Sequence, residues 1–103
     1  MIRPIVWSTA ALDDLDGAIA YIAARNPRAA RRLLATIDKT VEGLAEMPTG
    51  RPGRVPKTHE RVVLGTPYVI AYALSPQDDG REAIVILRIV HGARNWPPET
   101  WPD

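Results

Sequence analysis

Apolar residues in the first part of the chain recur with the period of an α-helix. Between residues 8 and 26, successive large apolar residues are three, four and three positions apart, which is the spacing of one stripe on an amphipathic helix. The stripe consists of Leu12, Leu15, Ile19 and Ile22. Ser8 or Thr9 can cap the N-terminus of this helix. The pattern therefore predicts a helix that buries one face.

A second helix is predicted immediately after the first. Asn26 can serve as its N-cap and Pro27 as its first residue, and Pro48 ends it near Met47. Its stripe consists of Ala30, Leu34, Ile37, Val41 and Leu44. Because the connection is so short, the two helices must lie antiparallel as an αα-hairpin.

The remaining apolar segments are short and rich in β-branched residues, as expected of strands. Thr49–Thr58 lacks periodicity and is interpreted as a surface connector. The predicted strands are Ile2–Trp7, His59–Leu64, Tyr68–Leu74 and Ala83–His91. Pro4 confines the first of them to an edge or a strand start. The order predicts one α+β domain over residues 1–103, in which a strand and an αα-hairpin precede a three-stranded antiparallel meander. The helices pack on one face of the sheet, and the tail from about residue 92 has no regular structure.

The last predicted strand contains an arginine among aliphatic residues. Residues 83–90 include six Ile, Val or Leu, interrupted by Arg88. Strict alternation would place Arg88 on one face with Ile84, Ile86 and Val90, and His91 on the other. An arginine at such a position needs a partner or a route to water. An ion pair at the strand end and a functional arginine in an open groove both remain open.

Composition limits the chemistry that the chain can carry. The 103 residues are 46% hydrophobic and 24% charged, with no Cys and only two His. Disulfides and thiolate metal sites are therefore excluded, and neither a metal site nor a cofactor is expected. No apolar run approaches the roughly 20 residues of a membrane span. A cytoplasmic location and no membrane association are expected.

Positive charge is concentrated in the second half of the chain. Residues 48–94 carry seven Lys or Arg against four Asp or Glu, and four of the seven positive residues fall between Arg51 and Arg61. This density suits a phosphate-rich or acidic partner. If Arg61 and Arg88 both point away from the helices, they share one groove beside the basic loop, but a one-residue register slip would reverse this. A further group, Arg28, Arg31 and Arg32, is interpreted as a solvated turn in preference to a binding patch.

Three stretches together carry a family resemblance. They are WSTAALDDLDGAIAYIAARNPRAA at the hairpin, GRPGRVPKTHERVVLGTPYVIAYAL in the first two meander strands, and ILRIVHGARNWP at the end. In this order and spacing the chain resembles, over nearly its whole length, the RelE/ParE superfamily. These proteins are the toxins of type II toxin–antitoxin modules. The likeness is nearest to the ParE-like, plasmid-stabilisation members.

The resemblance implies a toxin that a cognate antitoxin neutralises in a hetero-oligomer, with a heterotetramer among the options. It also implies that operator DNA is reached only through the antitoxin. ParE-like members inhibit DNA gyrase by binding, and this is the main interpretation. The alternative is a RelE-like, metal-independent endoribonuclease that cleaves messenger RNA on the ribosome, and a non-toxic partner-binding module is a further one. Whether the chain is an enzyme is left open.

The nuclease alternative can be stated residue by residue. Arg61 and Arg88 match, by strand position, basic residues of RelE-like nucleases, and His91 is the best acid–base candidate. His59 and Glu60 are weaker acid–base candidates. The tyrosine that many such nucleases carry near the C-terminus has no clear match here. The basic surface that would contact a target or partner consists of Arg51, Arg54, Lys57 and Arg94.

Overall fold

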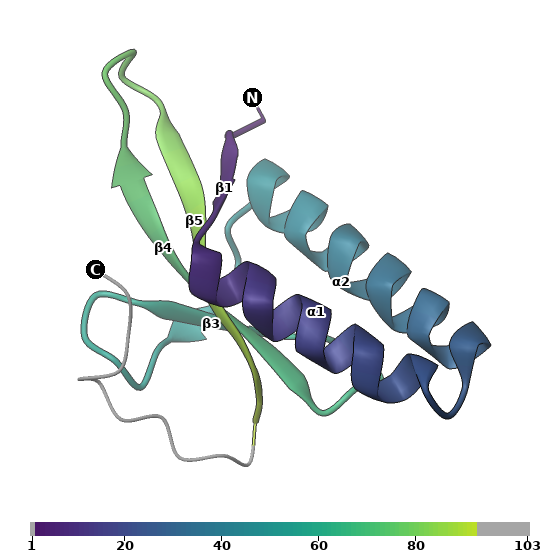
Figure 1. Ribbon diagram of the computed structural model, residues 1–103. Coiled ribbons are helices and arrows are strands. Elements are labelled where there is room, and N and C mark those ends of the chain that lie inside the picture. The colour runs from purple at the N-terminus through teal and green to yellow at the C-terminus, as the bar shows by residue number, and fades with distance from the viewer. Residues whose placement is uncertain (1, 93–103) are drawn as a thin grey trace.

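The computed structural model describes residues 2–92 of the chain, in which two helices and five strands follow one another (Figure 1). The elements are β1 (Ile5–Trp7), α1 (Thr9–Ala23), α2 (Pro27–Glu46), β2 (Arg51–Pro52), β3 (His59–Val62), β4 (Tyr68–Pro76) and β5 (Glu82–His91). The predicted order of a strand, two helices and a meander is confirmed. Arg94 and the rest of the predicted tail from residue 93 onward lie outside the described residues.

The strands form one sheet in the order β1-β5-β4-β3-β2. β1 runs parallel to β5 at one edge, which fits the restriction that Pro4 places on it. All other neighbours are antiparallel. β2 is a correction to the sequence-based expectation, because residues 51–52 pair with β3 where only a connector was predicted.

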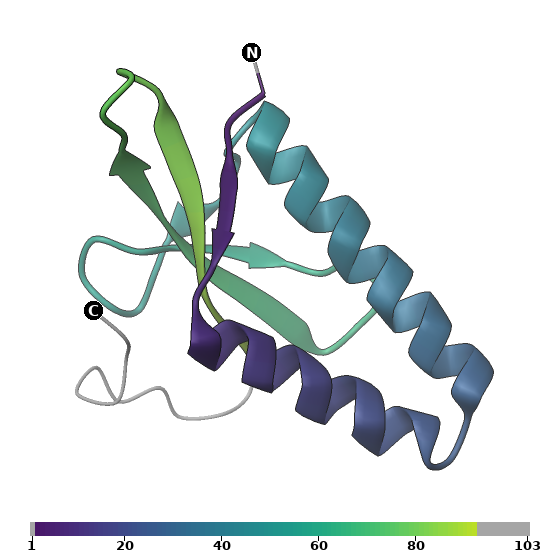
Figure 2. The same ribbon diagram turned by 45° about the horizontal axis from the view of Figure 1, so that its top comes forward.

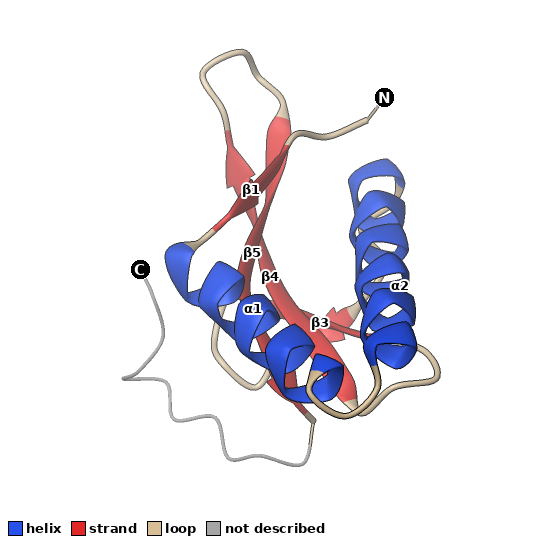
Figure 3. Ribbon diagram, turned by 45° about the vertical axis from the view of Figure 1, so that its right-hand side comes forward, coloured by secondary structure: helices blue, strands red, loops and turns tan. Residues whose placement is uncertain are grey.

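Both helices begin where the sequence predicts. The Ser8 hydroxyl accepts a hydrogen bond from the Ala11 N–H at 3.0 Å, and the Asn26 side chain accepts one from the Ala29 N–H at 3.1 Å. The helices lie antiparallel and on the same side of the sheet (Figure 3). Most members of their apolar stripes pack against it, as predicted, but Leu12 and Leu34 are exposed. The fully buried centre of this core includes Ile37, Leu44, Ile70, Tyr72, Ile84 and Ile86.

The opposite face of the sheet buries much less. Val69 and Ala71 form a small second cluster there, with Val90 packed against it. The two faces are therefore unequal, and the helix-covered face carries the main core. Figure 2 shows that β3 and β4 extend beyond the helices, on the side where the loop after β2 lies.

Strict alternation along β5 fails at one point. Tyr72 pairs with Ile86, but the preceding residue, Ala71, pairs with Arg88, so Leu87 is an extra residue on β5. Such a β-bulge moves every later side chain to the face opposite the one that simple alternation predicts. Ile89 therefore joins Ile86 in the helix-side core. The predicted grouping of Arg88 with Ile86 is wrong for this reason.

Candidate functional site

Arg88 is bound to the first helix. Its Nε donates to Oδ2 of Asp14 at 2.7 Å, and its Nη2 donates to Oδ1 at 3.0 Å. Two parallel bonds of this kind form the strongest side-chain ion pair. Hydrogen bonding to Asp14 raises the pKa of the Arg88 guanidinium above its usual value, so Arg88 remains charged. Of the two readings of Arg88, the structure supports the one in which a carboxylate is its partner.

Asp14 also protects the part of β5 that β1 does not reach. β1 ends beside Ile86, and from there the start of α1 takes over. The Ser8 N–H donates to the Ile86 carbonyl at 3.0 Å, and the Ser8 hydroxyl donates to the Leu87 carbonyl at 2.9 Å. The Ile89 N–H then donates to Asp14 at 2.9 Å. The helix start therefore satisfies backbone groups that an edge strand would leave open.

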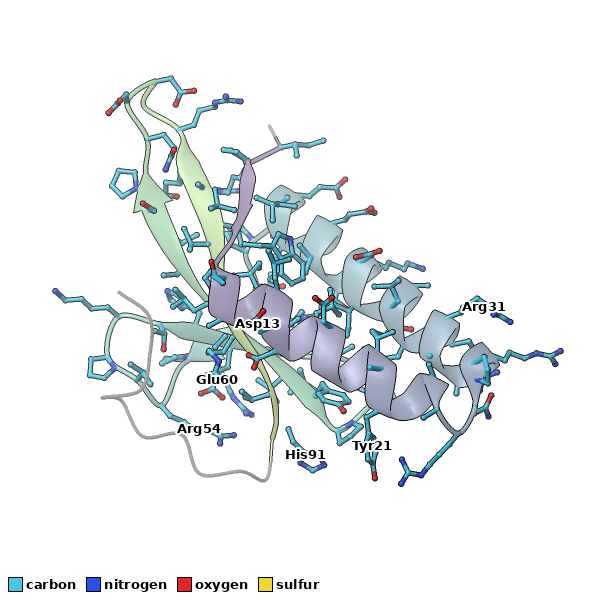
Figure 4. All side chains as sticks on the ribbon, viewed as in Figure 1. Asp13, Tyr21, Arg31, Arg54, Glu60 and His91 are labelled. Carbon is cyan, nitrogen blue, oxygen red and sulfur yellow. The ribbon has the colours of Figure 1, made fainter. Side chains whose placement is uncertain are left out.

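A cavity of about 620 Å³ lies between α1 and the end of β5, and both Arg88 and His91 line it. His91 pairs with Tyr68 across the strands, and their rings meet edge to face with centroids 6.1 Å apart. Tyr21 of α1 lines the same cavity, and Figure 4 shows it beside His91. Two of the three candidate catalytic residues therefore share one cavity. The hydrogen-bonding fork of Arg88, however, is already engaged by Asp14.

Arg61 lies elsewhere, on the helix-covered side of β3. It is opposite Ile70, which belongs to the main core, and it lines a groove with residues of α2. The expectation that Arg61 and Arg88 share a groove on the uncovered face is wrong. Arg61 faces α2, whereas Arg88 contacts α1. The expectation assumed that side chains alternate strictly along β5, and the bulge at Leu87 breaks that alternation before Arg88.

Arg61 is close to a buried tyrosine. Burial raises the pKa of the Tyr72 phenol, and the positive charge of Arg61 opposes part of that rise. The hydroxyl of Tyr72 has no hydrogen-bond partner among the described residues. Its ring stacks on His59 with centroids 5.4 Å apart. His59 is thereby held as a packing partner on the helix-covered face.

The basic loop is organised around Glu60, which is only 3% exposed. Arg51 Nη2 lies 3.2 Å from one Glu60 oxygen, and the Arg54 backbone N–H donates to the other at 2.8 Å. Arg54 also donates to the Gly92 carbonyl at 3.0 Å. Figure 4 shows Arg54 and Glu60 on the same side of the molecule. These contacts hold the loop to the sheet. The carboxylate of Glu60 therefore neutralises part of the positive charge that this surface was predicted to present.

Lys57 lies in the same loop and has an unusual backbone conformation. Its φ of 67° places it in the left-handed region, which residues other than glycine rarely adopt. The loop therefore turns sharply at this residue, between the Glu60-bound arginines and the start of β3. Contacts of Arg51, Arg54, Lys57 and Arg94 with a target or partner remain a prediction.

A groove between α2 and β3 presents apolar side chains to solvent. It has a volume of about 420 Å³ and is lined by Lys39, Met47, Arg61, Val62 and Leu64, among others. Met47 is 66% exposed, Val62 39% and Leu64 75%. Large apolar side chains gathered in a groove beside cations are typical of a protein-binding surface. β2 pairs only with residues 59–60 of β3, so within residues 2–92 the edge of β3 beyond them has no neighbouring strand.

Sequence reasoning missed the ion pairs of the two carboxylates that organise these sites, since Asp14 was not singled out and Glu60 was considered only as an acid–base candidate. Asp14 lies just before Leu15 of the first apolar stripe, so its helix position placed it near the sheet. Glu60 lies within a predicted strand and close to a cluster of cations, which was the available signal for its ion pairs. In both cases the charges were visible in the sequence, but the pairing depended on tertiary structure.

Within residues 2–92, no group of three or more His, Cys, Asp or Glu is placed to hold a metal ion. None of the helices in this range has the length and hydropathy needed to cross a membrane.

Residues 5–96 match the family described as the ParE toxin of the type II toxin–antitoxin system parDE. The chain therefore belongs to the ParE toxin family, and the predicted superfamily is confirmed.

Individual relatives agree with this assignment. The protein Y4kP of Sinorhizobium fredii is 40% identical over 96 residues, which cover 92% of this chain and 94% of that protein. Toxin RelE2 of Caulobacter vibrioides is 36% identical over 90 residues, which cover 87% of this chain and 96% of that protein.

Solved structures share the fold. A chain of the chromosomal ParDE toxin–antitoxin system from P. aeruginosa is similar with a TM-score of 0.76 at 22% identity, and the match covers 87% of this chain and 96% of that one. A chain of the RelBE2 toxin–antitoxin complex from Mycobacterium tuberculosis is similar with a TM-score of 0.54 at 19% identity, and the match covers 88% and 99%. Both neighbours are chains of toxin–antitoxin systems, and the likeness shows that this chain shares their fold.

Proposed function

We propose that this toxin arrests growth by binding and inhibiting DNA gyrase, and that it acts in the cytoplasm. The observation that supports this most is the match of residues 5–96 to the ParE toxin family. The arrangement of the candidate catalytic residues supports it as well. Arg61 lies in a different cavity from Arg88 and His91, and Asp14 already binds the Arg88 guanidinium. Metal-independent RNA cleavage needs a base, an acid and cations converging on one phosphate.

The direct test is a gyrase supercoiling assay with purified full-length toxin. Relaxed plasmid, gyrase and ATP are incubated with increasing toxin, and the same toxin already bound to its antitoxin serves as the control. We expect supercoiling to be lost near one toxin per gyrase and to be restored by the antitoxin. Normal supercoiling at a stoichiometric excess of toxin would overturn the proposal.

The RelE-like alternative is retained because Arg88 and His91 do share a cavity. It predicts cut messenger RNA in cells that express the toxin without its antitoxin. Intact transcripts in growth-arrested cells would exclude it. Unimpaired growth under the same conditions would instead indicate the non-toxic partner-binding module.

We propose that the antitoxin binds in the groove between α2 and β3. Met47, Val62 and Leu64 provide exposed apolar surface, and Lys39 and Arg61 stand beside them. An antitoxin segment carrying apolar and acidic residues would complement both features. The unpaired edge of β3 can add an extended segment by backbone hydrogen bonding. We expect poor solubility of the toxin alone, rescue by co-expression, and a hetero-oligomer, which light scattering can identify as a heterotetramer.

A further inference from the structure

The turn between the two helices carries an isolated group of arginines. Arg25, Arg28, Arg31 and Arg32 are all exposed, and we call them the arginine tip. No Asp or Glu occurs between Asp16 and Asp38, so this part of the chain carries a local charge of +4. Within residues 2–92 none of the four forms an ion pair with a carboxylate. The overall charge of +1 therefore conceals a strongly positive end of the hairpin.

Three of these arginines lie on one side of α2. Arg28, Arg31 and Arg32 fall within roughly 100° of arc at 3.6 residues per turn. That side is opposite the buried residues of the helix, such as Leu33 and Ile37. Figure 4 shows Arg31 projecting outward from α2. A helical scaffold thus presents the guanidinium groups to one partner surface.

The charges of α2 are arranged against its own dipole. A helix favours acidic residues in its first turn and basic residues in its last, because its N-terminus carries partial positive charge. α2 has neither, and its outer side instead runs from Arg28 near the start to Glu46 at the end. The cationic start is therefore a cost to the folded chain. Such conflicts between a local rule and the sequence are expected at functional sites.

Arg25 completes the tip from the end of α1. Its guanidinium carbon lies 4.2 Å from the centroid of the Tyr21 ring, and its Nη1 donates to the Tyr21 carbonyl at 3.4 Å. Stacking on the ring fixes the cation in place while leaving donors free to reach outward. Within residues 2–92, only this arginine of the four donates a hydrogen bond to a carbonyl near the C-terminus of α1.

We propose that the arginine tip binds the phosphate backbone of duplex DNA. Arginine forks match phosphate oxygens, and protein–DNA interfaces are polar and strongly positive. Protein–protein interfaces have an apolar centre instead, and from residue 17 to residue 37 the exposed large apolar side chains are Tyr21, beneath Arg25, and Leu34. This inference deepens the proposed gyrase function, because gyrase holds a DNA duplex that a bound toxin could contact. The recognition is of backbone charge and carries no base sequence.

The test measures binding of the full-length toxin to a fluorescein-labelled DNA duplex by anisotropy over a range of salt concentrations. The tip variant is Arg28→Gln and Arg31→Gln, because glutamine retains helix propensity. The matched control removes the same charge elsewhere, through Arg3→Gln and Arg81→Gln. Far-UV circular dichroism verifies that both variants are folded.

We expect the tip variant to bind duplex at least tenfold more weakly than the control at low salt. Its slope of log affinity against log salt should be smaller by about 2, since each of the two lost phosphate contacts contributes about 0.9. Equal weakening in both variants, or no binding of the unmodified toxin at low salt, would overturn the proposal. Displacement of the duplex by polyglutamate at equal charge would also overturn it, in favour of an acidic protein partner.

A stability measurement separates this role from a structural one. Arg28→Glu places the favoured charge in the first turn of α2, so the melting temperature should rise by about 2–6 °C while duplex binding falls. A lower melting temperature would mean that Arg28 stabilises the fold, which contradicts the proposal. If the toxin binds duplex but does not inhibit gyrase, the proposed gyrase function is wrong and the proposed DNA contact remains supported. If the toxin inhibits gyrase but does not bind duplex, the DNA contact is wrong and the gyrase function remains supported.

Discussion

The ion pair between Asp14 and Arg88 gives the sharpest test of the structure. Removing one member of a buried pair costs about 3–5 kcal/mol, because the other charge is left without a partner. Here the Arg88 side chain is 26% exposed and the Asp14 side chain 16% exposed, so water can reach the remaining charge and reduce the loss of stability. We therefore expect Asp14→Ala and Arg88→Ala each to lower the free energy of unfolding by about 2–3 kcal/mol. Because the pair fails as a unit, the double variant should cost about 1–2 kcal/mol less than the sum of the single variants.

Urea unfolding followed by far-UV circular dichroism measures these changes. Asp16→Ala is the matched control, since Asp16 is exposed on the same helix and forms no ion pair within residues 2–92. The control should change stability by less than about 0.5 kcal/mol. An Asp14→Ala midpoint equal to that of the control would refute the structural role of the pair. A catalytic Arg88 would give a different result, with toxicity lost and the unfolding midpoint unchanged.

Three further substitutions test the roles of Glu60, Tyr72 and Leu64. Glu60→Ala should release the loop that Arg54 holds, so limited trypsin digestion should cut after Arg54 faster than in the unmodified chain; an unchanged rate would contradict this. Tyr72→Phe removes a buried hydroxyl without a partner, so it should leave stability unchanged or raise it by about 1 kcal/mol in urea unfolding. Because burial raises the pKa of Tyr72 in the folded chain, its stability contribution is present below the usual pKa of about 10 and declines as pH rises above it. The Phe variant should lack that alkaline decline, and an identical pH profile would argue against it. Leu64→Asp should weaken antitoxin binding at least tenfold in calorimetry while the toxin remains folded, and unchanged affinity would move the antitoxin away from the groove.

Much of the fold could be predicted because the local signals agree with one another. Asn26 and Pro27 mark the start of α2, and most of both apolar stripes faces the sheet as the spacing requires. Pro4 correctly restricted β1 to an edge. These features depend on residues that are close together in the sequence, where capping, backbone restriction and helical period act directly.

The arrangement of the candidate site could not be predicted in the same way. A single extra residue at Leu87 moved Arg88 relative to Ile86, and no residue type at that point marks a bulge. The partners of the arginines come from distant segments, as Asp14 and Arg88 are 74 positions apart. The pairing therefore became visible only once α1 was placed against β5.

We propose that this chain acts as a stoichiometric binder of gyrase and not as a catalyst. The toxin concentration that halves supercoiling, determined at two gyrase concentrations tenfold apart, tests this proposal. For a stoichiometric binder, we expect the half-inhibitory concentration to rise in proportion to gyrase. Full supercoiling at every ratio, accompanied by cleavage of messenger RNA in expressing cells, would contradict it.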